Sequence, residues 1–185
     1  MKKGLALVVV VLCLCGCSAE SEMEQAMRFR DMLLSGNGCS FTAHITADYG
    51  DELQEFTMDC TGDNQGNLKF SVTEPESISG ITGSASEAGG ALTFDDVALH
   101  FHLMAQDALS PVSAPWILVR TLRSGYITSA CREEETIRLS VEDSFEEDSL
   151  RLDIWLNTGG MPEHADILYG GRRILSVDVE NFQIL

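Results

Sequence analysis

The stretch CSFTAHITADYGDELQEFTMDC, residues 39–60, decides the fold because its polarity repeats every two residues. Phe41, Ala43 and Ile45 alternate with threonine and histidine, which is the period of a strand with one buried face. A second alternating run begins at about Leu53, after a polar segment rich in turn-forming residues. The pattern therefore predicts a β-hairpin.

The centre of the hairpin sets which side chains lie opposite one another. A turn centred on residues 49–50 places Phe41 across from Met58 and Cys39 across from Cys60. This register predicts a disulfide between Cys39 and Cys60.

A third thiol, Cys131, follows far downstream. Thiols of exported proteins tend to pair in an oxidising compartment, and an odd number leaves one of them free. The alternative is three buried free thiols in a protein from a reducing habitat, and both alternatives stay open at this point.

Further strands and two helices follow from the same kind of patterning. Ser21 and Glu24 have the spacing of a capping box, and the helix that they begin should end near Gly36. Pro111 and Pro115 precede a second helix over about residues 116–122. Further strands are expected at about 68–73, 92–103, 126–131, 136–141, 150–156, 163–169 and 173–184, with a weak strand and a loop between 77 and 90. The predicted class is α+β, a curved antiparallel sheet wrapped on an N-terminal and a mid-chain helix.

The N-terminus has the layout of a bacterial lipoprotein signal. Lys2 and Lys3 precede an apolar run too short to span a bilayer, and LCGC at residues 14–17 resembles a lipobox. Cys17 is then the lipidated residue, and the protein is expected outside the cytoplasm, anchored to the cell membrane. The expected division is a signal peptide at 1–16, the lipidated cysteine with a short tether at 17–22, and one domain at 23–185.

The charge balance limits the partners. The chain has 12 Lys and Arg against 29 Asp and Glu, for a formal net charge of −17. Such a field disfavours nucleic acid and anionic headgroups and tolerates cations and basic protein surfaces. Acidity also keeps an exported domain soluble, which is the simpler interpretation because the acids are spread along the chain.

Several segments together resemble the LolA/LolB/LppX group of carrier folds. They are the lipoprotein leader, the single first helix, NLKF at 67–70 with EP at 74–75, the proline-containing mid-chain helix, and the closing strands MPEHADI at 161–167 and RILSVDVENF at 173–182. The resemblance implies an unclosed β-barrel around helices, with an apolar space that holds lipid or an acylated protein. GerS-like lipoproteins of spore formers, with a similar fold, act by binding another protein.

The resemblance implies a non-catalytic binding module for an acyl chain or lipid. The alternative function is a lipoprotein that binds and regulates or localises a partner protein at the envelope. The side chains expected to line the cavity are Phe41, Phe56, Met58, Phe70, Phe94, Leu99, Phe101 and Trp116. The same alternating residues would equally suit a filled core, because any sheet packed on helices needs them.

Trp155 separates the two functions. It lies on the strand face opposite to Leu152 and Ile154. An exposed tryptophan there would favour a protein-contact surface.

Catalytic and metal chemistry find little support in the sequence. His100 and His102 share one strand face, but no third and fourth ligand stands at a matching spacing, so no metal site is expected. No nucleophile motif, P-loop or HExxH sequence occurs, and the paired acids fall at strand ends and turns. We expect no enzyme activity and no cofactor.

The lipobox generates a direct test. Replacing Cys17 by Ser should abolish acyl labelling and release or misprocess the protein, because only the thiol at this position accepts the lipid. Replacing Cys13 or Cys15 should leave both unchanged. Metabolic labelling with a clickable fatty acid and membrane fractionation measure the outcome, and continued labelling of the Cys17→Ser protein would contradict the lipoprotein assignment.

Overall fold

The computed structural model describes residues 20–48, 50, 53–94, 97–101, 104–105, 108–144 and 149–185. The expected signal peptide and Cys17 lie outside the described residues, as do His102 and the side chain of Phe101. Within the described part, no helix has the length and apolarity that a membrane crossing requires.

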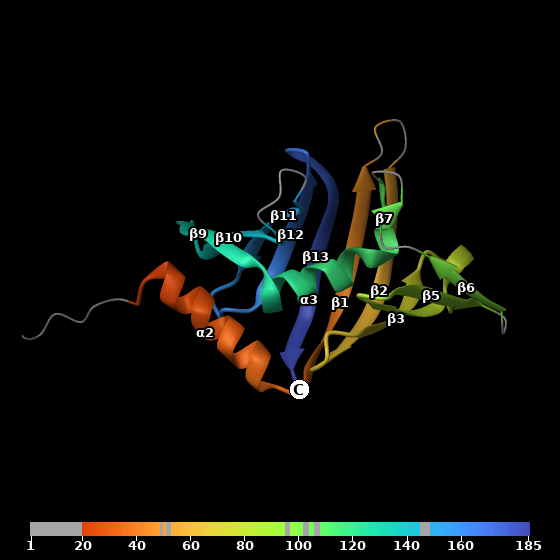
Figure 1. Ribbon diagram of the computed structural model, residues 1–185, viewed down its shortest axis with the longest axis horizontal. Coiled ribbons are helices and arrows are strands. Elements are labelled where there is room, and N and C mark those ends of the chain that lie inside the picture. Colours follow the sequence, from red (N-terminus) through yellow and green to blue (C-terminus); the bar gives the residue numbers. More distant parts are fainter. Residues whose placement is uncertain are drawn as a thin grey trace, which may run out of the picture.

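One large antiparallel sheet forms the body of the protein (Figure 1). Its eleven strands are β1 (Gly38–Asp48), β2 (Leu53–Asp63), β3 (Leu68–Glu74), β4 (Thr82–Ser86), β5 (Gly89–Phe94), β6 (Val97–Phe101), β9 (Tyr126–Glu133), β10 (Thr136–Glu142), β11 (Arg151–Leu156), β12 (Pro162–Tyr169) and β13 (Arg172–Ile184). A separate two-stranded sheet joins β7 (Met104–Ala105) to β8 (Ala108–Leu109).

Two meanders make up this sheet, and the first and last strands join them. The chain runs outward from β1 to β6, crosses over, and returns from β9 to β13, which pairs antiparallel with β1 from Cys39↔Ile184 to Ala47↔Leu175. Among the described residues, β6 and β9 are the two edges and do not pair with each other. The sheet is therefore a curved, unclosed barrel, as predicted.

Two helices, α2 (Glu22–Ser35) and α3 (Ala114–Ser124), accompany the sheet. The predicted capping box is present, since Ser21 Oγ accepts from the Glu24 amide and Glu24 Oε2 accepts from the Ser21 amide. Figure 1 shows α3 crossing β1 and β13, and α3 contacts β2, β10 and β13. Short 3₁₀ turns at Glu76–Ile78 (η1) and Pro111–Ser113 (η2) follow β3 and precede α3.

The two helices exchange hydrogen bonds through arginines. Arg30 Nε donates to the Leu122 carbonyl of α3 at 2.8 Å, and Arg123 Nη1 donates to the Leu33 carbonyl of α2 at 3.3 Å. Both acceptors lie in the last turn of their helix, where carbonyls lack an intrahelical partner. Each helix therefore supplies the cation that satisfies the end of the other.

The β1–β2 hairpin has a different register from the predicted one. Ala43, not Phe41, lies opposite Met58, and Cys39 lies opposite Gly62. The last pair is Asp48↔Leu53, so four residues connect the strands and the turn centre is one residue later than predicted. A shift of two residues keeps each side chain on its own face, so the buried set was predicted correctly and the pairing was not.

This register explains why the predicted disulfide is absent. Cys39 and Cys60 are buried free thiols on one face of the hairpin, in diagonal positions instead of opposite ones. Burial raises the pKa of Cys39 to about 11 and also raises the pKa of Cys60, so both stay protonated. Cys131 is also a free thiol, but it is only half-buried. The alternative of three buried free thiols therefore holds for Cys39 and Cys60 and not for Cys131.

Thiol reactivity tests this arrangement. In purified residues 18–185, Ellman's reagent should titrate three thiols under denaturing conditions and only Cys131 rapidly in the native protein. Cys39 and Cys60 should react at least about 100-fold more slowly, because they need a local opening of the sheet. A Cys131→Ser variant should lose the fast phase, whereas a Cys39–Cys60 linked peptide in non-reducing mass mapping would contradict the register.

Candidate functional site

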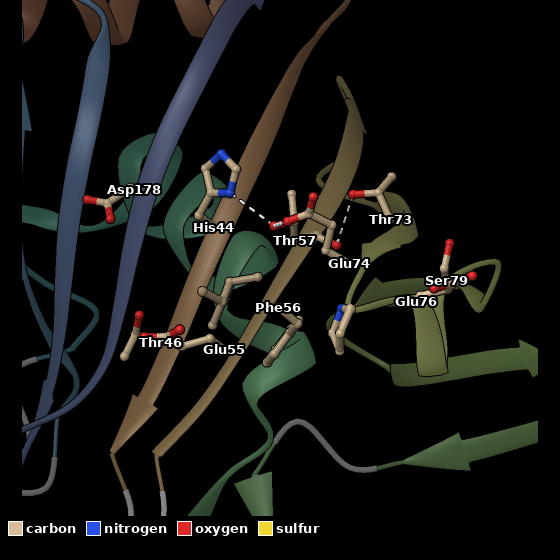
Figure 2. Close-up of a pocket in the computed structure, with 12 residues that line it drawn as sticks. His44, Thr46, Glu55, Phe56, Thr57, Thr73, Glu74, Glu76, Ser79 and Asp178 are labelled. Atoms are coloured by element: carbon tan, nitrogen blue, oxygen red, sulfur yellow. Dashed lines mark hydrogen bonds between the residues drawn. The ribbon is translucent and has the colours of Figure 1, made fainter.

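A polar groove of about 780 Å³ opens where β1, β2 and β3 meet η1. Its lining residues are His44, Ile45, Thr46, Glu55, Phe56, Thr57, Thr73, Glu74, Pro75, Glu76, Ser79 and Asp178 (Figure 2). The ladder between β2 and β3 is irregular at Thr57 and Met58, and β3 ends at Glu74. An irregular pairing of this kind bends the strand and opens space beside it.

A short hydrogen-bond chain crosses the groove floor (Figure 2). Thr57, only 8% exposed, donates its hydroxyl to Glu74 Oε2 at 3.2 Å and lies 3.0 Å from His44 Nδ1. Since the Thr57 proton goes to Glu74, the hydroxyl oxygen is left to accept from His44 Nδ1–H. The described residues that line the groove include four carboxylates and no Lys or Arg, so the groove favours cations over anions.

His164 is held between two carboxylates beside this groove. Its Nδ1 lies 2.5 Å from Asp178 Oδ1, and its Nε2 lies 3.3 Å from Asp166 Oδ1. The contact with Asp166 raises the pKa of His164 most and the bond to Asp178 adds to this, while partial burial opposes it. Burial opposes ionisation of Asp166 as well, but hydrogen bonds from His164 and Ser176 outweigh it and lower the pKa of Asp166.

The same cluster has the atoms of a Ser–His–Asp triad, which the sequence pattern does not reveal because its members come from two strands. Ser176 Oγ lies 3.4 Å from His164 Nε2, and His164 contacts Asp178. Ser176, however, donates its hydroxyl proton to Asp166 Oδ1 at 2.8 Å. A nucleophilic serine must give that proton to histidine, so the cluster acts as a bridge between β12 and β13.

A charged network continues across the neighbouring strands. Asp153, 8% exposed, accepts from Ser140 at 2.7 Å and from Arg151 at 3.0 Å, with Arg138 at 3.5 Å. Trp155 is half-buried: its Nε1 donates to Glu133 Oε2 at 3.0 Å, and its ring meets His164 edge-on. Because Trp155 is already engaged in this way, it gives little support to a contact surface at this position.

The eight predicted cavity residues do not share one space. Phe41, Met58, Phe70 and Trp116 are at most 5% exposed and belong to the packed core, where Phe41 stacks on Phe182 with ring centroids 5.4 Å apart. Phe56 lines the polar groove. Phe94 and Leu99 are 50% and 63% exposed on the β5–β6 hairpin, and the side chain of Phe101 lies outside the described residues.

Two adjoining cavities of about 390 Å³ each flank Trp116 and Arg120 of α3, which line both. The first is mainly apolar, lined by Glu87, Leu109, Trp116, Ile117, Arg120, Asp143 and Leu150. The second is polar, lined by Gln65, Gly66, Asn67, Ser86, Glu87, Ala88, Trp116, Arg120, Arg123 and Ser124. Of these residues, only Trp116 was among the predicted site residues.

Trp116 and Arg120 are fixed against each other at this junction. Trp116 Nε1 donates to the Gly66 carbonyl at 2.9 Å, and the Arg120 guanidinium carbon lies 5.4 Å from the indole centroid, within cation–π range. Nε of Arg120 is buried and makes no hydrogen bond among the described residues, although Glu87 Oε1 lies 3.5 Å from it. Within the described part of the chain, Arg123 donates only to backbone carbonyls, those of Leu33 and Asn64.

The described residues include no group of three or more His, Cys, Asp or Glu side chains placed to hold a metal ion. His100 is exposed on β6, and its predicted neighbour on the same face is outside the described part.

No protein-family model matches this chain, and no curated protein matches it significantly. Similar solved structures include an uncharacterized conserved protein from Thermus thermophilus, with 12% identity, 86% of this chain and 87% of that chain covered, and a TM-score of 0.47. A LolA superfamily protein from Nitrosomonas europaea has 9% identity, coverages of 86% and 93%, and a TM-score of 0.44. The Mycobacterium tuberculosis lipoprotein LppX has 10% identity, coverages of 87% and 92%, and a TM-score of 0.42. No site residue is transferred from these structures to this chain.

The His164 cluster predicts how stability depends on pH. His164→Gln should destabilise the domain by about 1 kcal/mol at pH 6, because protonated His164 bridges two carboxylates on a partly exposed face. The folded pKa of His164 is raised above its unfolded value near 6.5, so the contribution is complete below that pH and disappears as pH rises through the folded pKa.

Urea unfolding of both proteins between pH 5.5 and 9 measures this difference. The gap between wild type and variant should narrow steadily with pH, and a gap that stays constant across the range would mean that the imidazole acts through packing alone.

Proposed function

We propose that this protein is a non-catalytic binding module of the bacterial cell envelope, anchored through Cys17, whose ligand is an amphiphile with an apolar chain and an anionic head. The observation that carries the proposal is the junction at Trp116 and Arg120, where an apolar cavity adjoins a polar one that contains two arginines. The sequence resemblance implies the apolar chain, whereas the anionic head and the location are new.

The apolar cavity suits a hydrocarbon chain. Leu109, Ile117 and Leu150 line it beside the Trp116 ring, and its volume lies in the range of small-molecule sites. It is lined by α3 together with Leu109 of β8 and residues next to β4, β10 and β11, whereas Phe41, Met58 and other side chains fill the core.

The polar cavity suits an anionic head despite the acidic surface of the protein. Arg123 has no carboxylate partner among the described residues. Arg120 forms ion pairs with Glu87 at 3.5 Å and with Asp143 at 3.7 Å. Glu87 is 83% exposed at its side chain, so it can turn away at little cost. The net charge of −17 opposes an approaching anion at long range, but salt screens that field beyond about 8 Å, whereas the arginines act at contact.

The experiment uses two ligands with the same chain and different heads. Dodecyl phosphate and dodecanol are titrated below their aggregation limits into residues 18–185 carrying Trp155→Phe, so that the remaining tryptophan, Trp116, reports binding by fluorescence. Dodecyl phosphate should bind more tightly than dodecanol. Arg123→Gln should weaken dodecyl phosphate by about 5–20-fold, the value of a lost charge-assisted hydrogen bond, and change dodecanol by less than about twofold.

Two further variants keep the result interpretable. Arg172→Gln removes an arginine that is 62% exposed on β13 and should change neither affinity. Ala88→Phe fills the polar cavity from an exposed turn without adding a second tryptophan, and should weaken dodecyl phosphate without lowering the melting temperature of the free protein. Equal binding of both ligands, or no response of Trp116 to either, would contradict the proposal.

A further inference from the structure

The two edges of the main sheet are protected differently. At β9, helix α2 packs against the edge, and Arg132 of that strand contacts Glu22 of the helix at 3.3 Å. At the other end, β6 pairs with β5 alone among the described residues. Natural edge strands are usually covered by a helix or carry charges or proline that prevent pairing with another chain.

Strand β6 lacks these protective residues. Its sequence VALHF, residues 97–101, contains no Lys, Arg, Asp, Glu or Pro. In an antiparallel edge strand, every second residue turns its amide and carbonyl away from the neighbouring strand. The free side of β6 therefore presents a row of backbone donors and acceptors that another strand can pair with.

Apolar side chains on one face of the β5–β6 hairpin extend the buried core outward. The pairs Leu92↔Leu99 and Phe94↔Val97 place these four side chains on the same face. Leu92 packs against the core, whereas Phe94, Val97 and Leu99 are 50%, 59% and 63% exposed. The hairpin thus carries a contiguous apolar surface directly beside an unpaired edge.

We propose that β6 is a docking edge for an extended segment of another protein, with alternating apolar residues that extend the Phe94–Leu99 face and with lysines or arginines between them. Charge complementarity decides between this occupant and a second copy, because each copy has a net charge of −17 and would repel the other. A basic strand gains from the same field. This docking edge is independent of the amphiphile site, since none of the residues that line the two α3 cavities belongs to β5 or β6.

The recognition follows the rules of strand addition. Main-chain hydrogen bonds along β6 would supply register-independent affinity, and alternate side chains of the incoming strand would meet Val97 and Leu99. The intervening residues of the incoming strand would face the side that His100 occupies, which is exposed to water. Apolar and basic residues in alternation therefore suit both faces.

The test uses defined peptides on residues 18–185. One fluorescent ten-residue peptide alternates valine with lysine, and the other alternates valine with glutamate. The lysine peptide should bind saturably in an anisotropy titration and slow amide hydrogen exchange in β6 by at least about tenfold, with no change in β9. The glutamate peptide should bind at least about tenfold more weakly.

A matched pair of variants distinguishes binding at the β6 edge from non-specific binding to exposed apolar side chains. Leu99 and Leu53 are both leucines and both 63% exposed, but Leu53 lies opposite Asp48 at the start of β2, an internal strand that is not part of the β5–β6 hairpin. Leu99→Ser should weaken the lysine peptide by about fivefold or more, while Leu53→Ser should change it by less than about twofold.

Three results would overturn the proposal. They are binding of the lysine peptide without protection of β6, equal effects of Leu99→Ser and Leu53→Ser, and a dimer in sedimentation equilibrium that Leu99→Ser dissociates, which would make a second copy the occupant. None of these outcomes involves Arg123 or Trp116, so failure here leaves the amphiphile titrations unaffected.

Discussion

Helix α3 must fill the inner face of a sheet that does not close, and the rest of the architecture depends on how completely it does so. Eight of its eleven residues are buried, which is more than one apolar stripe can account for. Three parts of the structure therefore surround the helix. They are the sheet, helix α2, which is joined to it by the two arginine–carbonyl hydrogen bonds, and the turns that follow β2 and β4. Because core side chains occupy the inner space, the ligand-sized spaces among the described residues lie outside the core, and they include the two cavities beside α3 and the polar groove beside β1, β2 and β3.

The sequence predicted the elements well and their alignment less well. Alternation of period two reflects which face of a strand is exposed to solvent. It therefore located β1, β2, β3 and β10 to β13 without any knowledge of the strands that pair with them. The Cys39–Cys60 pairing depended on the length of one turn, which alternation does not encode, and a shift of two residues was invisible in the pattern. The alternation of polar and apolar residues shows which face of a strand is buried. The register between two strands depends also on the length of the turn that connects them.

The candidate sites were harder to predict for a related reason. Trp116 was recognised as an apolar residue, but its role at the junction needs Gly66, Asn67 and Ala88, which come from two distant turns. Arg120 and Arg123 could have been found from sequence alone, since they stand three residues apart on one helix in a chain with few cations. The His164 cluster needed the pairing of β12 with β13 to bring its members together.

Pairing of β1 with β13 has a consequence for the order in which the protein is made. The first strand of the sheet cannot complete its ladder until the final residues of the chain exist, and at about 5–20 residues per second this takes on the order of ten seconds after β1 emerges. Meanwhile the amides and carbonyls of β1 that will meet β13 have no strand to pair with. A chain built in this way remains incompletely folded throughout its synthesis, which is the condition that a translocation channel for unfolded polypeptides requires.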